Sequence, residues 1–265
     1  MEYKYFPHTE SEIKEMLDIV GVGSLDELYS DVPEEIRFKK EYDLPEAMSE
    51  MEVRRFFEAL GNENKRLVCF AGAGVYDHYT PAVVERIVQR SEFLTSYTPY
   101  QAEISQGTLH YIFEYQSMMA ELTGMDISNA SMYDGSTATA EAMMMAVAAG
   151  KKCDTVLVSE TVDKKVLTVV KTYAKFHGVN IVMVKENDGI TDKADFQEKI
   201  AQKGVAGVIV QQPNRYGIVE DYAGYADAAH DNKALMIMNG VAADYAVLKT
   251  PAEWGADIAV GDGQS

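Results

Sequence analysis

From residue 155 onward, short apolar segments of the chain alternate with longer amphipathic ones. The apolar segments are 155–160, 180–185, 205–213, 234–240 and 256–262. They are rich in β-branched residues and apolar on both faces, which is typical of buried parallel strands. The segments between them (163–177, 192–203 and 220–232) are long enough for right-handed crossover helices. This alternation predicts an α/β fold with a mainly parallel sheet flanked by helices.

The first 64 residues have a different texture, polar and helical. Amphipathic helices are expected over 9–21, 24–33 and 48–64. Each begins with a pair that has the capping-box spacing: Thr9 and Glu12, Ser24 and Glu27, and Ser49 and Glu52. We therefore expect an N-terminal helical segment over 1–64 and a large α/β domain over 65–265.

Charge and composition exclude several classes of function. The 24 Lys+Arg residues against 42 Asp+Glu residues give a formal charge of −18, which would repel phosphate backbones and anionic lipid. We expect no nucleic-acid partner and no membrane association, since no apolar run reaches the ~18–20 residues of a membrane span. With two cysteines and no paired His or Cys motif, we expect no metal site and a cytoplasmic location.

The segment 97–107 (YTPYQAEISQG) concentrates hydrogen-bonding side chains directly before an apolar helix. They are Tyr97, Thr98, Tyr100, Gln101, Glu103, Ser105 and Gln106. If Glu103 is buried, it needs a partner and could accept a proton or bind an ammonium group. The alternative is a polar loop with two aromatic anchors, and the residues alone do not decide between these interpretations.

A second candidate site lies at 133–146 (YDGSTATAEAMMMA). Asp134 and Gly135 predict a turn, Ser136 or Thr137 could cap a helix, and the Ala-rich sequence continues that helix. Small residues and free N–H groups at a helix N-terminus suit a phosphate or a carboxylate. A well-capped buried helix with small residues for close packing is the equal alternative.

The chain ends on TPAEWGADIAVGDGQS (250–265), a predicted strand followed by a glycine turn. A complete domain seldom ends where a strand leads out to nothing, so we expect the chain to be cut short after Ser265. A frayed but complete terminus is the alternative.

Longer strings within the chain resemble a known family. They are AGAGVYDHYTP, SEFLTSYTPYQAEISQGTLHYIFEYQSMMAELTGMDISNASMYDGSTATAEA, VIVQQPNRYGIVED and WGADIAVGDGQS. Together they closely resemble glycine dehydrogenase (decarboxylating), the P-protein of the glycine cleavage system, and more narrowly subunit 1, its N-terminal half. The resemblance covers nearly all 265 residues.

The resemblance implies a type I fold of pyridoxal-phosphate (PLP) enzymes, with a seven-stranded mainly parallel sheet, and here without a C-terminal small domain. It also implies a reaction. Glycine is decarboxylated on PLP, and its aminomethyl group passes to the lipoyl arm of H-protein. The cofactor supplies the electron sink, while the protein supplies position and electrostatics.

One departure from the family pattern concerns the cofactor lysine. In the half of the family that bears PLP, a His-Lys pair follows the Gly-Ala-Asp sequence, and here those positions fall at Gln264 and Ser265. No lysine follows Lys249. The resemblance then implies that a partner, glycine dehydrogenase subunit 2, holds PLP covalently. It leaves no catalytic residue in this chain alone, so we expect the isolated chain to be inactive.

Site residues follow from the same resemblance. Gly135, Ser136 and Thr137 would form a vestigial phosphate cradle rather than a working one. The residues expected to line the entrance near glycine or the lipoyl arm of H-protein are Tyr97, Thr98, Tyr100, Gln101, Glu103 and Gln106.

Two other classes of function remain open. The chain could be a non-catalytic scaffold that stabilises its partner subunit, or a remnant that binds PLP or a small amino acid without a covalent bond. A missing domain would also leave an apolar, tyrosine-rich surface, which would favour a homodimer of the isolated chain.

Overall fold

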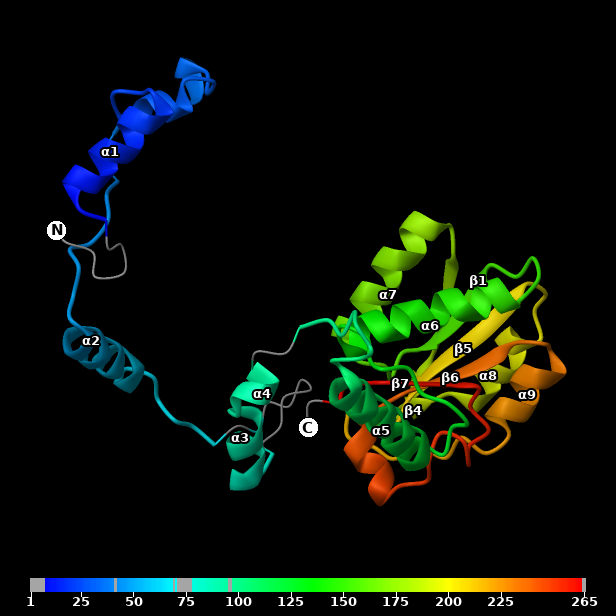
Figure 1. Cartoon of the computed structure of the whole chain (residues 1–265). Coiled ribbons are helices and arrows are strands. Elements are labelled where there is room, and N and C mark those ends of the chain that lie inside the picture. The colour runs from blue at the N-terminus through cyan, green and yellow to red at the C-terminus, as the bar shows by residue number, and fades with distance from the viewer. Residues whose placement is uncertain (1–7, 41, 69, 71–77, 95–96, 264–265) are drawn as a thin grey trace. The chain divides into compact units, whose positions relative to one another are not determined.

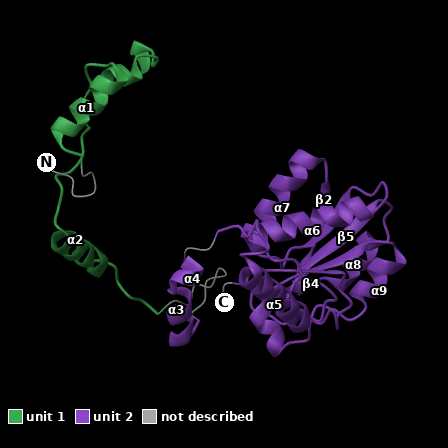
Figure 2. Ribbon diagram, viewed as in Figure 1, with its two compact units in different colours: residues 1–68 green, residues 69–265 purple. Residues whose placement is uncertain are grey.

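The structure, a computed structural model, describes residues 8–40, 42–68, 70, 78–94 and 97–263. The chain divides into two units, Met1–Val68 and Cys69–Ser265 (Figure 2). Gln264 and Ser265, where the family pattern places the cofactor lysine, lie outside the described residues.

The described residues of unit 1 form two α-helices and two short 3-10 helices: α1 (Glu10–Val20), η1 (Leu25–Tyr29), η2 (Glu34–Ile36) and α2 (Glu50–Asn62). The capping boxes expected at Thr9 and Ser49 are both confirmed. The one expected at Ser24 is wrong, because Ser24 makes no capping bond and the Glu27 carboxylate accepts from the backbone of Gly23 instead, at 2.9 Å. No residue of α1 or α2 is buried.

Unit 2 begins with helices: α3 (Ala82–Val88), α4 (Ser91–Leu94), α5 (Gln106–Thr123) and α6 (Gly135–Ala149). Helix α5 ends at Gly124, whose φ of 72° is a left-handed conformation that glycine adopts without strain. Among the helices of the described ranges, none combines the length and the apolar character that a bilayer crossing demands.

The main sheet has five strands, all parallel, in the order β2-β1-β5-β6-β7. The strands are β1 (Thr155–Ser159), β2 (Asn180–Val184), β5 (Val205–Gln211), β6 (Leu235–Asn239) and β7 (Ile258–Val260). Each of the five apolar segments contains one of these strands, which confirms the predicted parallel sheet. The resemblance implies seven strands for the whole fold, and the described residues form five in this sheet.

Helices cover both faces of the sheet, as buried parallel strands require (Figure 1). On one face, α6 and α7 (Lys164–His177) pack against strand residues that include Val156, Ile209 and Ile237. On the other, α8 (Lys193–Ile200) and α9 (Tyr225–Asp231) pack against Leu157, Val208 and Met236. Because side chains alternate along a strand, adjacent residues such as Val156 and Leu157 belong to different cores.

Two local features differ from the sequence-based expectation. A hairpin of β3 (Glu186–Asn187) and β4 (Ile190–Thr191) follows β2, and its turn residues Asp188 and Gly189 both have positive φ. An Asp-Gly pair is a recognised signature of such turns. The helix expected over 220–232 begins only at Tyr225, because Gly224 before it has a φ of 82°, which lies outside the helical range.

Methionines of α6 offer a matched pair for testing which side of the helix faces the core. Met143 is 0% exposed, whereas Met145 is 59% exposed. We expect Met143→Ala to lower the free energy of unfolding by about 2–5 kcal/mol, because it leaves a cavity. Met145→Ala should change it by less than about 0.5 kcal/mol. Urea denaturation measures both, and equal effects would contradict the packing described for α6.

Candidate functional site

The carboxyl ends of the five parallel strands lie along one edge of the sheet. After β1 the chain adds β2 on one side, and it then crosses to place β5 on the other side of β1. In open α/β sheets, ligands bind outside the carboxyl ends of the strands at such a switch point. The residues just beyond β1 and β5 are therefore the first place to look for a site.

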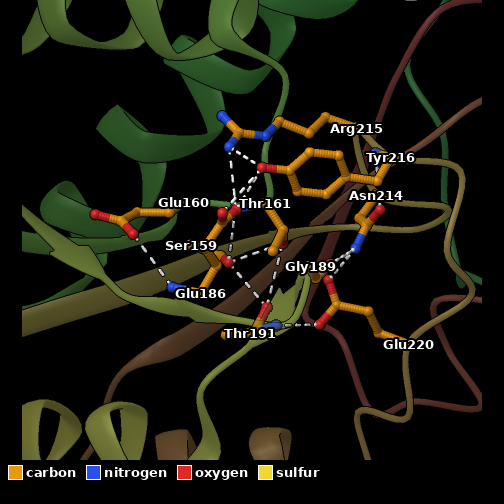
Figure 3. A network of polar contacts seen from close by, with 10 residues as sticks. All are labelled: Ser159, Glu160, Thr161, Glu186, Gly189, Thr191, Asn214, Arg215, Tyr216 and Glu220. Atoms are coloured by element: carbon orange, nitrogen blue, oxygen red, sulfur yellow. Dashed lines mark hydrogen bonds and ion pairs between the residues drawn. The ribbon is translucent and has the colours of Figure 1, made fainter.

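Three buried hydroxyl groups fill the region beyond β1. Ser159 Oγ lies 2.8 Å from both Thr161 Oγ1 and Thr191 Oγ1, and the two threonine hydroxyls are 3.2 Å apart. All three side chains point toward one another in Figure 3, and all three residues are buried. These hydroxyls bond among themselves, so they join the end of β1 to the β3–β4 hairpin.

Glu220 is a buried carboxylate beside this hydroxyl cluster, with only 6% of the residue exposed. Its Oε2 accepts from the backbone N–H of Thr191 at 2.7 Å, and its Oε1 accepts from the side-chain amide of Asn214 at 2.7 Å. The Gln212 side chain bonds the N–H and the C=O of Glu220, both at 2.9 Å. The carboxylate is thus held by groups of its own chain.

Arg215 and Tyr216 form the rim of the same network (Figure 3). The Arg215 guanidinium lies 3.0 Å from Glu186, and the Tyr216 hydroxyl donates to Glu186 at 2.8 Å. The backbone N–H of Arg215 donates to the carbonyl of Thr161 at 2.9 Å. Of the side-chain atoms in this network, Arg215 Nε is buried without a partner. The switch point is therefore occupied by a network of hydrogen bonds that holds the 212–220 connection against the end of β1.

The other end of the carboxyl edge brings together β7 and the N-terminus of α6. Asp134 is the N-cap residue, because its carboxylate accepts from the backbone of Thr137 at 2.7 Å and Thr137 Oγ1 accepts from the backbone of Asp134 at 3.3 Å. The expectation that Ser136 or Thr137 caps this helix is wrong: Thr137 is the third helical residue of the capping box. The Asp-x-x-Thr spacing thus marks the start of a helix in the same way as the Ser/Thr–Glu pairs at Thr9 and Ser49 in unit 1.

The first amide of α6 already has an anionic partner. The backbone N–H of Gly135 donates to Oδ1 of Asp262 at 2.9 Å. A Cβ at Gly135 would lie 3.0 Å from the backbone nitrogen of Asp262 and 3.0 Å from the carbonyl carbon of Gly261, so a larger residue would press against the strand exit. Sequence reasoning missed Asp262, since the two residues lie 127 positions apart and no local pattern connects them.

Between β6 and β7 the backbones approach even more closely. The Gly240 N–H donates to the Val260 carbonyl at 2.9 Å, and a Cβ at Gly261 would lie 1.6 Å from the Gly240 carbonyl oxygen. The Tyr245 hydroxyl is buried beside Gly240 without a hydrogen-bond partner. Burial raises the pKa of Tyr245, and Asp244 adds to the effect, so this phenol stays protonated.

The predicted substrate segment, Tyr97 to Gln106, leads into α5, whose first residue is Gln106, and is largely exposed. Tyr97 is 82% and Tyr100 79% exposed, and their ring centroids are 6.3 Å apart. Glu103 is also exposed, so the condition under which it would need a buried partner is not met within this chain. The Gln106 side chain donates to the carbonyl of Glu103 at 3.3 Å. The segment gathers the expected side chains locally, and their role stays a prediction.

The last residues of the five described strands do not fit PLP. The five strands end on Ser159, Val184, Gln211, Asn239 and Val260, none of which is a Schiff-base lysine or an aspartate for the pyridine nitrogen. The last lysine of the sequence, Lys249, has its ammonium group 3.8 Å from the centroid of the Trp254 ring. The Gly135 N–H, which could otherwise bind a phosphate, donates to the Asp262 carboxylate. Within the described residues, this chain does not provide a covalent cofactor site.

Removal of the Glu220 carboxylate tests the structural role of the network. Glu220→Ala leaves the Thr191 N–H and the Asn214 amide without their acceptor, so we expect unfolding free energy to fall by about 2–5 kcal/mol. Glu198→Ala, on the exposed side of α8, should cost less than about 0.5 kcal/mol. Chemical denaturation compares the two variants. A Glu220→Ala protein as stable as wild type would show that these hydrogen bonds do not hold the connection.

Comparison with known proteins places these features in a family. The glycine cleavage system P-protein family matches residues 3–265. The chain is 48% identical over 267 aligned positions to the probable glycine dehydrogenase (decarboxylating) subunit 1 of Bacillus pumilus, and 48% identical over 265 positions to that of Carboxydothermus hydrogenoformans. These alignments take in 100% and 99% of this chain. In both cases the chain spans 59% of the length of the relative.

Solved structures agree with the sequence relatives. A crystal structure of glycine decarboxylase (P-protein) of the glycine cleavage system, in inhibitor-bound form, superposes with a TM-score of 0.87 at 42% identity, over 100% of this chain and 59% of that one. A cysteine desulfurase from Thermococcus onnurineus, with a TM-score of 0.53 at 18% identity over 82% of this chain and 53% of that one, shares the fold alone. The family match, the identities and the superposition together show that this chain belongs to the glycine cleavage system P-protein family.

Proposed function

We propose that this chain acts as the half of glycine decarboxylase that does not hold the cofactor, and that a partner, glycine dehydrogenase subunit 2, carries PLP. The proposal is supported by the near-complete alignment with relatives named subunit 1, which the chain matches over 59% of their length. The observation that carries it concerns the described strand ends: none of the five strands of the main sheet ends on a lysine or on an aspartate.

The reaction proposed for the assembled protein is the decarboxylation of glycine, with transfer of the aminomethyl group to the lipoyl arm of H-protein in the cytoplasm. PLP, when bound to the partner, supplies the electron sink for loss of carbon dioxide. This chain would contribute groups that bind and orient the substrates. By itself it is expected to be inactive and to associate with a second copy of itself.

The Tyr97–Gln106 segment is the part of the chain best placed for that contribution. Its two phenols and the Glu103 carboxylate are exposed, whereas the polar groups beyond β1 are bonded among themselves. A carboxylate at the entrance of a shared site would attract the glycine ammonium group or accept a proton. Tyr97 and Tyr100 would present aromatic surface to glycine or to the lipoyl arm, with Thr98, Gln101 and Gln106 as hydrogen-bonding neighbours.

Carbon exchange between glycine and bicarbonate tests the proposed function. The exchange is measured with H-protein and PLP, for this chain alone, for the candidate partner alone and for their mixture. We expect exchange only in the mixture, because neither chain would have a complete site. A full-length relative of subunit 1 mixed with the same partner is the positive control.

Two results would contradict the proposal. A partner that exchanges carbon at the same rate without this chain would reduce the chain to a scaffold. A silent mixture beside an active positive control would show that this chain does not complete the site.

Glu103→Gln tests the proposed entrance residue in the active mixture. The variant removes a negative charge from an exposed position, so the fold should be unaffected, and we expect turnover to fall at least about tenfold. Glu198→Gln makes the same chemical change on the exposed side of α8 and should leave turnover as it is. Steady-state exchange rates at saturating glycine give the comparison. Unchanged kinetics in Glu103→Gln would exclude a catalytic or binding role for this carboxylate.

A further inference from the structure

We propose that the Asp262 carboxylate occupies the N-terminus of α6 and thereby prevents a phosphate group from binding there. This helix end is the place where the resemblance to PLP enzymes puts the cofactor phosphate. The inference concerns binding to this chain by itself. Its outcome is therefore separate from the exchange activity of the assembled protein.

The starting point is the electrostatics of the helix end. The first amides of an α-helix lack intrahelical acceptors and carry a partial positive charge, which attracts anions. In α6 two carboxylates already meet these amides: Asp262 accepts from Gly135 at 2.9 Å, and Asp134 accepts from Thr137 at 2.7 Å. A phosphate dianion would have to displace the Asp262 carboxylate and approach the Asp134 carboxylate. Both steps are unfavourable for a second anion.

The position of Asp262 is set by the sheet rather than by a free loop. The Gly240 N–H bonds the Val260 carbonyl at 2.9 Å, two residues before Asp262. Gly261 then passes against the Gly240 carbonyl so closely that a Cβ would lie 1.6 Å from its oxygen. The end of β7 therefore leads the Asp262 carboxylate directly to the α6 terminus.

The approach from the helix side is equally close. A Cβ at Gly135 would lie 3.0 Å from the backbone nitrogen of Asp262 and 3.0 Å from the carbonyl carbon of Gly261. This contact holds the Asp262 backbone, and with it the carboxylate, directly beside the first amide of α6. The closing of the helix end therefore depends on the Asp262 side chain, which a substitution can remove.

Asp262 itself is exposed, which makes the proposal testable. Removing an exposed side chain opens the helix end to solutes without creating a buried cavity. Two variants separate charge from volume: Asp262→Ala removes the carboxylate, and Asp262→Asn keeps its size but not its charge. Asp231→Asn, on an exposed residue at the end of α9, is the control for the change in net charge.

The experiment measures binding of three probes to the full 265-residue chain. The probes are inorganic phosphate, pyridoxine 5′-phosphate and pyridoxine. Pyridoxine phosphate has the cofactor's ring and phosphate but no aldehyde, so it cannot form Schiff bases with surface lysines. Calorimetric titration gives the affinity, and the backbone amide resonance of Gly135 reports whether the probe is at the helix end.

We expect no saturable binding of any probe to wild type or Asp231→Asn. Asp262→Ala should bind both phosphate probes saturably, with a shift of the Gly135 amide, and should not bind pyridoxine. Asp262→Asn should also gain binding of both phosphate probes. If Asp262→Ala does not fold, the result for Asp262→Asn tests the proposal. Wild type that binds phosphate at Gly135, or Asp262 variants that gain no affinity, would overturn the proposal.

Discussion

The close contact between α6 and the sheet sets the position of this helix over the central strands and of its N-terminus at their carboxyl edge. Helix α6 packs on the sheet through very small residues: a Cβ at Gly207 in β5 would lie 3.1 Å from the Cβ of Ala146, and Gly135 meets Gly261 beyond β7. This close packing lets one helix cover the central strands along their length. It also brings the helix N-terminus to the carboxyl edge, where the polar chemistry of this fold lies.

At that edge most of the polar groups form hydrogen bonds with other groups of the same chain. Beyond β1, hydroxyl groups and the Glu220 carboxylate form a closed network, and beyond β7, Asp262 bonds the end of α6. The side chains of the Tyr97–Gln106 segment, by contrast, are largely exposed. This division fits the proposed function, in which the exposed segment would contribute to a site shared with another chain.

Much of the fold could be predicted from the sequence because the relevant information is local. Apolar segments with β-branched residues identified all five strands of the main sheet, and the Thr9 and Ser49 capping boxes marked helix starts. The capping box predicted at Ser24 was wrong, because the Glu27 carboxylate accepts a hydrogen bond from the backbone N–H of Gly23 instead. The same sequence spacing therefore also occurs at the start of a 3-10 helix. Helix α9 begins late because Gly224 takes a left-handed conformation, which the apolar periodicity of 220–232 does not reveal.

The candidate site was harder to predict, since its contacts join distant residues. Motifs located the α6 terminus and the polar segment before α5, but the carboxylate that meets Gly135 comes from the opposite end of unit 2. Loss of Asp262 alone would free the first amide of α6 for another anion, but it would add no lysine to the described strand ends. An anion cradle and an amine, the two requirements of a PLP site, therefore depend on separate residues, and no single substitution at Asp262 would supply both.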